Sequence, residues 1–508
     1  MDSSTVRRRV VAGFAWEGVS KAIVQTASWV STLFVARLLA PTDYGLMATA
    51  GVFIGFLLFV TEMGLSQGLI QSKTTDARQE DGIFYLSLLV GALSYAALYA
   101  GAPAVAGFYR MPLLTDLLRV AGATLLLASL TTVPLAIALR RLDFRYRSLV
   151  QMAAGLASML TVVTMALHDL GVWSLVGGTV AHHLVLALGY LPVLRRIPKL
   201  QFAWRETAAI LNFGLQMTGN RFLNALWSRA DVFIIARVLG ERLLGFYAMA
   251  YQLSSMPLDK VGSIFNQVLF PAVARLQEHA EETRRLFLDM HRVLLLIGFP
   301  VLTGLALTAA DAVHVLLTEK WSPIVPLLQG LCLVNMLRLS GMVLPPVLYA
   351  RGRPGLMTLY NLGMLLLLPA AIFVGMEYGV VGAVYAWIAA YPLMYVVLLA
   401  FSLRELGLPL GRFLASTLPA LAATALMAAA VAAVQHRAPD APLLRLMLAV
   451  VTGALVYGSV LLVLYRGKLR NLRSEIRRLK QGRRLPKQAP DAAPATVAAE
   501  PDKGRSPS

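Results

Sequence analysis

Apolar segments long enough to cross a bilayer recur along most of the chain, separated by short polar loops. A spanning helix needs about 20 apolar residues, because the hydrocarbon core of a membrane is about 30 Å thick. The pattern predicts an all-α integral membrane protein with about 14 transmembrane helices. Their expected ranges are 10–38, 43–70, 82–108, 114–139, 148–167, 172–194, 207–239, 243–270, 287–310, 323–350, 355–376, 379–403, 412–435 and 443–465.

One stretch of the chain is repeated about halfway along it. VARLLAPTDYGLMATA, from Val35 to Ala50, aligns without a gap with IARVLGERLLGFYAMA, from Ile235 to Ala250. Arg37 coincides with Arg237, and Gly45 coincides with Gly245. Such a repeat is typical of transport proteins that are built from two related bundles, and it predicts two pseudo-symmetric lobes.

The repeat and the composition of the ends predict the domain organisation. We expect an N-lobe over 1–200, a C-lobe over 201–410 and two further helices over 411–466. The remaining residues, 467–508, are expected to form a cytoplasmic tail that is first basic and then disordered. The basic part is expected to bind anionic membrane lipid.

Loop charge provides a check on the number of spans. With the N-terminus placed in the cytoplasm, the inner loops carry twenty Lys and Arg residues before the tail. The outer loops carry only Arg110, Arg242, Lys320 and Arg437. This alternation follows the positive-inside rule and predicts that both termini are cytoplasmic.

Composition and motif content narrow the class of protein further. The chain is 57% apolar and 14% charged, whereas about a quarter of the residues in soluble proteins are charged. The net charge of +19 is explained by the loops and the tail, so nucleic acid is not an expected partner. The one cysteine, Cys332, lies in an apolar segment, and no metal site is expected. No HExxH, nucleophile elbow or P-loop is present, so we do not expect an enzyme.

The strongest functional signal is a set of ionisable residues inside the predicted spans. Lys21, for example, lies about 16 Å along the first helix if the membrane begins near Val10. Charged groups at that depth are costly and are expected to face a protein interior or a hydrated cavity. The predicted substrate-binding residues are Lys21, Arg221, Lys260, Arg338 and Arg229. The candidates for ion coupling or counter-charge are Glu17, Asp231 and Asp259.

Each of these residues also has a purely structural interpretation. Glu17 and Lys21, four residues apart, are spaced to form an ion pair within one helix. Asp231 would serve only to neutralise Arg229. Arg37 and Arg237 precede helix breaks, and we expect them to hold the following turns and not to bind substrate.

Several stretches resemble the polysaccharide-transporter branch of the multidrug/oligosaccharidyl-lipid/polysaccharide (MOP) exporter superfamily, the Wzx-type flippases. They are FVARLLAPTDYGLMATAGVF, ALRRLDFRYRSLV, LGVWSLVGG, NQVLFPAVARLQ and EKWSPIVPLLQGL. The resemblance implies a two-lobe protein of the bacterial inner membrane that moves undecaprenyl-pyrophosphate-linked oligosaccharide units to the periplasmic leaflet through a cationic cavity. We expect no cofactor. A proton or sodium gradient is a candidate driving force, and a polysaccharide polymerase and chain-length proteins are candidate partners.

Two other functions remain open from the sequence. A cation-coupled multidrug exporter of the same superfamily would need a cavity lined by acidic residues. The excess of cations within the predicted spans does not favour such a cavity. A membrane polysaccharide polymerase or glycosyltransferase would want a large periplasmic loop or a cytosolic domain, and the sequence shows neither.

Overall fold

The computed structural model describes residues 25–62, 69, 77–141, 143–199, 219–220, 222–275 and 280–464, apart from the side chains at 144 and 259–275. The chain divides into two compact units, Met1–Tyr457 and Gly458–Ser508. In the second unit the described residues are only the end of one helix, so the fold described below is that of the first unit.

The described secondary structure is helical. Residues 25–38 form the described part of the first helix, and residues 219–220 and 222–228 are also helical. The other elements are α2 (Pro41–Glu62), α4 (Ala77–Tyr109), α5 (Leu114–Arg140), α6 (Phe144–Leu167), α7 (Val172–Tyr190), η1 (Leu191–Leu194), α9 (Ala230–Arg275), α10 (Ala280–Leu307), α11 (Ala309–Leu316), η2 (Glu319–Ile324), α12 (Val325–Gly341), α13 (Leu344–Ala350), α14 (Pro354–Gly375), η3 (Met376–Tyr378), α15 (Gly379–Leu406), α16 (Leu410–Gln435) and α17 (Pro442–Leu464).

Ten helical segments among the described residues are long and apolar enough to cross a membrane. One of them, Pro354–Leu406, contains both α14 and α15, which the sequence predicts as separate spans. The helices begin and end within a few residues of most predicted boundaries. The total of about 14 spans and the cytoplasmic location of both termini remain predictions.

Two helices are interrupted where the backbone requires it. Gly240 has a positive φ of 78° and divides α9 into two helices, close to the predicted boundary. Glycine adopts this conformation without the steric cost that a side chain would bring. The predicted span 323–350 is broken between α12 and α13, where Pro345 and Pro346 begin the second helix. Proline suits this position, since the first turn of a helix needs no backbone N–H donor.

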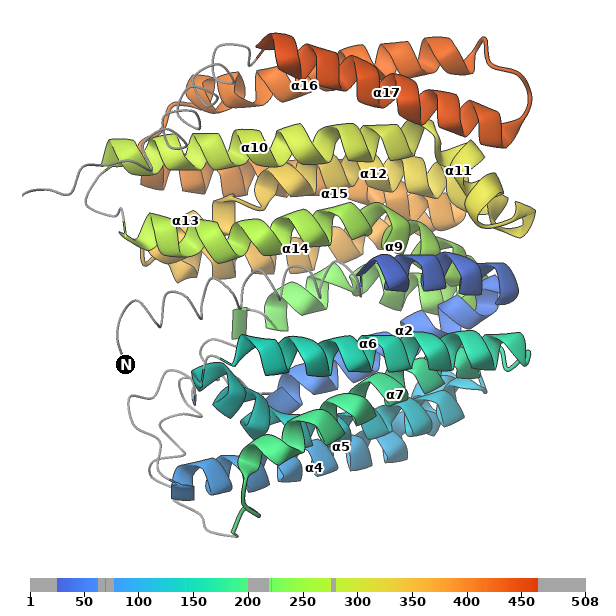
Figure 1. The fold of residues 1–508 in the computed structure, drawn as a ribbon, viewed down its shortest axis with the longest axis vertical. Coiled ribbons are helices and arrows are strands. Elements are labelled where there is room, and N and C mark those ends of the chain that lie inside the picture. The colour runs from blue at the N-terminus through green and yellow to red at the C-terminus, as the bar shows by residue number, and fades with distance from the viewer. Residues whose placement is uncertain are drawn as a thin grey trace, which may run out of the picture. The chain divides into compact units, whose positions relative to one another are not determined.

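The helices form two halves that meet at α2 and α9. In Figure 1, α4 to α7 lie on one side of these two helices, while α10 and α12 to α16 lie on the other. We call residues 25–199 the N-half and residues 219–406 the C-half. Within the N-half α4 packs on α5 and α6 on α7, and within the C-half α14 packs on α15 and α10 on α12.

The contact between α2 and α9 has the symmetry that the repeat predicts. Gly45 lies so close to the backbone of Glu241 that a β-carbon there would collide with its carbonyl group. Gly245 lies equally close to the backbone of Pro41. A shift of 200 residues turns the first pair into the second, as expected of an isologous contact around a pseudo-two-fold axis.

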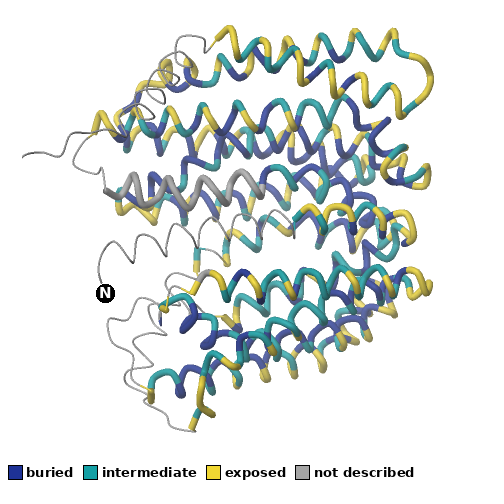
Figure 2. The backbone as a smooth tube through the Cα atoms, viewed as in Figure 1, coloured by how far each residue is buried: buried dark blue, intermediate teal, exposed yellow. Residues whose placement is uncertain are grey.

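On the outward helix faces the exposed residues are largely apolar, the reverse of the pattern in a soluble protein. Figure 2 shows buried residues where helices face one another and exposed residues along their outer sides. Those outer sides carry large apolar residues such as Leu366, 76% exposed, and Phe373, 68% exposed. Exposed apolar surface of this extent is expected when the surrounding medium is lipid.

Candidate functional site

A cavity of about 630 Å³, which we call the junction cavity, lies between the two halves. One wall is the face of α2 that carries Gly51, Gly55 and Phe56. The opposite wall is formed by residues 220–229 together with α13 and α14. With α2 beginning at the outer surface, as the loop charges predict, the cavity is expected in the middle and inner part of the membrane.

Polar side chains line the C-half wall of the junction cavity. Asn220, Asn224 and Ser228 follow one another at intervals of four residues, which places them on one helix face. The Nε1–H of Trp227 donates to Oδ1 of Asn361 at 3.1 Å, and Nδ2 of Asn361 donates to the carbonyl of Asn220 at 3.4 Å. The side chain of Asn224 makes no hydrogen bond with a described residue, so it can bind a ligand.

Arg229 is the described cation that lines this cavity. It follows the helix of residues 222–228, precedes α9, and its side chain is exposed. Its guanidinium makes neither a hydrogen bond nor an ion pair with any described residue. A guanidinium attracts anions, and its planar donors match the oxygens of a phosphate. This part of the cavity is therefore suited to a phosphate group.

Arg338, on α12, is half-buried and lines neither the junction cavity nor the second cavity described below. Its Nη1 donates to the hydroxyl of Tyr251 and to Oδ1 of Asn335, both at 3.1 Å. Its guanidinium carbon lies 5.4 Å from the ring centroid of Trp387. Its cation is thus held by neutral polar groups and an aromatic face. Among the described residues no carboxylate lies within 4.0 Å of it.

Asp231, the first acidic residue of α9, is buried with 1% of its surface exposed. Its Oδ1 accepts from the backbone N–H of Val232 at 2.8 Å. Its Oδ2 accepts from the Tyr247 hydroxyl at 2.6 Å and from Nε1–H of Trp387 at 3.3 Å. Trp387 therefore has the Asp231 carboxyl at its N–H edge and the Arg338 cation over its face. The indole ring connects the two charged groups without a direct ion pair.

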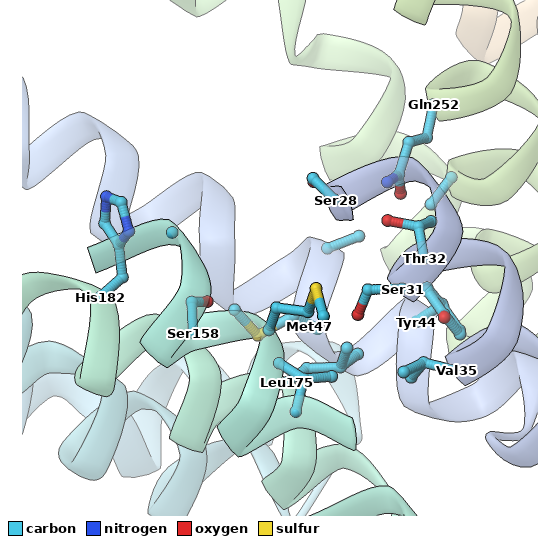
Figure 3. A pocket seen from close by; sticks show the side chains of 15 residues that line it. Ser28, Ser31, Thr32, Val35, Tyr44, Met47, Ser158, Leu175, His182 and Gln252 are labelled. Carbon is cyan, nitrogen blue, oxygen red and sulfur yellow. The ribbon is translucent and has the colours of Figure 1, made fainter. Parts of the chain in front are cut away.

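A second cavity, of about 440 Å³, lies nearer the predicted outer surface, and we call it the outer cavity. Residues 28–35 of the first helix, the beginning of α2, α6, α7 and α9 contribute to its wall. Figure 3 shows Ser28, Thr32 and Gln252 on one side of it and His182 on the other, with Ser158 between them. The described lining side chains are neutral hydroxyl, amide, imidazole and apolar groups.

Contacts between the halves also gather at the outer end. Arg37 of the N-half donates from Nε to the Leu316 carbonyl at 2.9 Å, and Trp321 donates from Nε1 to the Ala36 carbonyl at 2.8 Å. Arg237 of the C-half lies with its guanidinium carbon 5.1 Å from the ring centroid of Phe108. The two repeated arginines thus reach across to the opposite half and do not simply hold their own turns. These contacts join the halves at the end that the loop charges predict to face outward.

The structure describes only some of the predicted site residues. Arg229 lines a cavity, and Trp387 brings Asp231 and Arg338 together. Lys21, Arg221 and Glu17 lie outside the described residues, as do the side chains of Lys260 and Asp259, so their roles remain predictions. The polar lining of both cavities was not predicted from the sequence. Its signal was the spacing of polar residues at intervals of three and four within apolar helices, as in Asn220, Asn224 and Ser228.

A bundle of two pseudo-symmetric helical halves with cavities at their junction defines a multi-pass membrane transport fold. The solved structure "Lipid II flippase MurJ, inward closed conformation" superimposes with a TM-score of 0.69 at 13% identity, covering 89% of this chain and 99% of that chain. An inward-facing multidrug resistance MATE transporter of the MOP superfamily gives a TM-score of 0.61 at 14% identity, covering 78% and 98%. The chain has the MOP superfamily fold.

The sequence comparison then defines the family. The family described as polysaccharide biosynthesis protein matches residues 34–326, and the chain belongs to this family. It is 26% identical over 381 residues to the lipopolysaccharide biosynthesis protein WzxC of Escherichia coli K12, covering 74% of this chain and 77% of that protein. It is 25% identical over 346 residues to the succinoglycan biosynthesis transport protein ExoT of Rhizobium meliloti, covering 68% of each. The resemblance found in the sequence is confirmed, and the chain is a multi-pass protein of the bacterial inner membrane.

Proposed function

We propose that this protein is a flippase that moves an undecaprenyl-pyrophosphate-linked oligosaccharide from the cytoplasmic to the periplasmic leaflet for surface polysaccharide biosynthesis. Family membership and the names of the relatives support the class of substrate. The observation that carries the proposal is Arg229, a cation exposed to a cavity between the two halves, at a depth where lipid would exclude it.

The substrate has three parts that need different surroundings. The pyrophosphate needs cations, the glycan needs polar groups and water, and the polyprenyl chain is most stable in lipid. In the proposed mechanism the pyrophosphate binds at Arg229, while the polyprenyl chain stays in the bilayer beside the protein. The contacts of Arg37 and Trp321 join the halves on the outer side, so the present conformation suits loading from the cytoplasmic side. Separation of those contacts would release the headgroup outward.

The driving force belongs to the same proposal. A proton or sodium gradient would need a carboxylate that gains and loses its ion during the cycle. Asp231 is the described candidate, and it reaches Arg338 through Trp387. Three donors already bond its carboxyl oxygens, so ion binding there would have to break at least one of these bonds. We propose coupling through Asp231 on this basis, and a polysaccharide polymerase and chain-length proteins as partners that receive the flipped unit.

The test is flipping by the purified protein in vesicles. Undecaprenyl-pyrophosphate-linked N-acetylglucosamine would be loaded in one leaflet, and its appearance in the other leaflet followed with an impermeant sugar-binding lectin. We expect flipping to be fast with the native protein and strongly reduced by Arg229→Gln. Arg242→Gln, an exposed arginine on α9 that does not line the cavity, serves as the matched control. Equal flipping by all three proteins would contradict the role of Arg229.

A multidrug exporter on the same fold is the second candidate, because MATE transporters are structural neighbours. The described lining of the junction cavity contains Arg229 and no carboxylate, which suits an anionic substrate better than a cationic drug. ExoT is named a transport protein and the MurJ neighbour a flippase, so these names do not favour a polymerase or glycosyltransferase. Unchanged tolerance to cationic drugs on deletion of the protein would remove the exporter candidate.

A further inference from the structure

Resting on the proposed function, we infer that the outer cavity binds the sugar part of the lipid-linked substrate while the junction cavity binds its pyrophosphate. The two cavities would then act as separate subsites for the two chemically different parts of one headgroup. Three observations support this division: the order of the cavities along α2, the state of the polar groups in the outer cavity, and the absence of charge among its described lining side chains.

The cavities follow one another along a single face of α2. Tyr44, Met47 and Ala48 line the outer cavity, while Gly51 and Gly55 line the junction cavity one and two turns further on. Residues three and four apart share a helix face, so the same stripe of α2 serves both cavities. In a lipid-linked glycan the pyrophosphate lies between the lipid and the sugar. A headgroup that enters from the cytoplasmic side therefore places its sugar beyond the pyrophosphate, where the outer cavity lies.

Three polar side chains of the outer cavity, those of Ser31, Thr32 and Gln252, lack hydrogen-bond partners among the described residues. Elsewhere on α6 and α7, Thr161 and Thr179 donate their hydroxyls to carbonyls four residues earlier, at 2.8 and 2.9 Å. Ser31, Thr32 and Gln252, by contrast, make no side-chain hydrogen bond with a described residue. Ser31 is only 8% exposed. These polar groups are not among the buried atoms without a partner and are accessible from the cavity, where the hydroxyls of a bound sugar would bond them in place of water.

The mixture of groups in the outer cavity matches a sugar better than an ion or an apolar drug. Sugars present hydroxyl groups at their rim and C–H groups on their faces. The cavity offers hydroxyl and amide groups beside apolar side chains such as Met47 and Leu175. His182 also lines the cavity, and an imidazole can donate a hydrogen bond to a sugar hydroxyl or accept one from it. The volume of about 440 Å³ lies in the range of small-molecule sites.

The test measures how much the sugar adds to binding. Dissociation constants of the purified full-length protein would be measured for undecaprenyl pyrophosphate and for the same lipid carrying N-acetylglucosamine or galactose. Thr32→Val and Gln252→Met remove hydrogen-bonding groups with little change of shape. We expect the native protein to bind at least one sugar-bearing lipid about 10-fold more tightly than the bare lipid, and the double variant to lose most of that gain. Its affinity for undecaprenyl pyrophosphate should be unchanged.

The controls separate the two proposals. Thr161→Val makes the same chemical change on α6 at a hydroxyl that does not line the cavity, and it should keep the sugar gain. Ser158→Ala repeats the test if the double variant does not fold. A native protein that binds all three lipids equally, or a gain that survives these substitutions, would show a merely hydrated cavity and overturn the inference. Failure of the native protein to bind any of the lipids would instead overturn the proposed function.

Discussion

The substitution Gly245→Ala tests the contact that joins the two halves at the predicted outer side. A β-carbon at Gly245 would fall on the Pro41 carbonyl, well inside the 3.0 Å that such atoms normally keep. α2 and α9 would have to separate by about 1 to 1.5 Å, and overpacking of this kind costs about 1–3 kcal/mol. The cost falls on the conformation in which the helices touch. Because about 1.4 kcal/mol is a factor of ten, we expect the outward-open conformation to gain about 10-fold in population.

Labelling of a single cysteine measures this shift. Cys332 is fully buried and would be replaced by alanine, and Ala48→Cys would place one thiol in the outer cavity. An impermeant maleimide added from the outside should react about 10-fold faster in the Gly245→Ala protein. Gly101→Ala is the matched control, because a β-carbon there meets no atom within 4 Å. Equal labelling rates in the two folded proteins would refute the view that the α2–α9 contact closes the outer side.

Three further predictions concern particular hydrogen bonds. Trp387→Phe removes the N–H donor to Asp231 and Tyr247 but keeps an aromatic ring. It should lower the free energy of unfolding by about 1–3 kcal/mol, measured by thermal unfolding. Tyr385→Phe, on the exposed face of α15, should change it little. His291→Leu removes a buried ring whose nitrogens lie 3.0 Å from the hydroxyls of Ser416 and Ser340. In the same measurement it should lower the free energy of unfolding by about 2–3 kcal/mol. His314→Leu, at an exposed site, should lower it little. Trp321→Phe removes the bond to the Ala36 carbonyl, so it should raise the outside labelling rate in the same direction as Gly245→Ala.

Much of the fold was predictable because the bilayer restricts it. Long apolar segments must be helices in lipid, and the alternation of loop charge orders them, so helix boundaries such as 114–139 and 172–194 were predicted within a few residues. The repeat of Val35–Ala50 predicted related halves, and the reciprocal approach of Gly45 and Gly245 is its structural counterpart. The break before Pro345 and the outer helix α11 were missed, because apolar length alone does not locate interruptions.

The site was less predictable, because depth along a helix does not say which way a side chain faces. Arg229 and Arg338 were both predicted to bind substrate, yet Arg229 lines a cavity and Arg338 is held by Tyr251 and Trp387. Ser31 and Thr32 could not be recognised from the sequence in the way that charged residues can. Serine and threonine are common in membrane helices, where their hydroxyls usually bond to carbonyls of the same helix. Only their lack of such bonds sets them apart.

The most direct test of the central claim is the affinity of the purified protein for undecaprenyl pyrophosphate relative to undecaprenol, with and without Arg229. If the junction cavity recognises phosphate through this cation, the native protein should strongly prefer the pyrophosphate lipid. Arg229→Gln should weaken its binding by about 10-fold or more and leave undecaprenol binding unchanged. A preference that Arg229→Gln leaves intact, or that Arg242→Gln reduces equally, would contradict the claim.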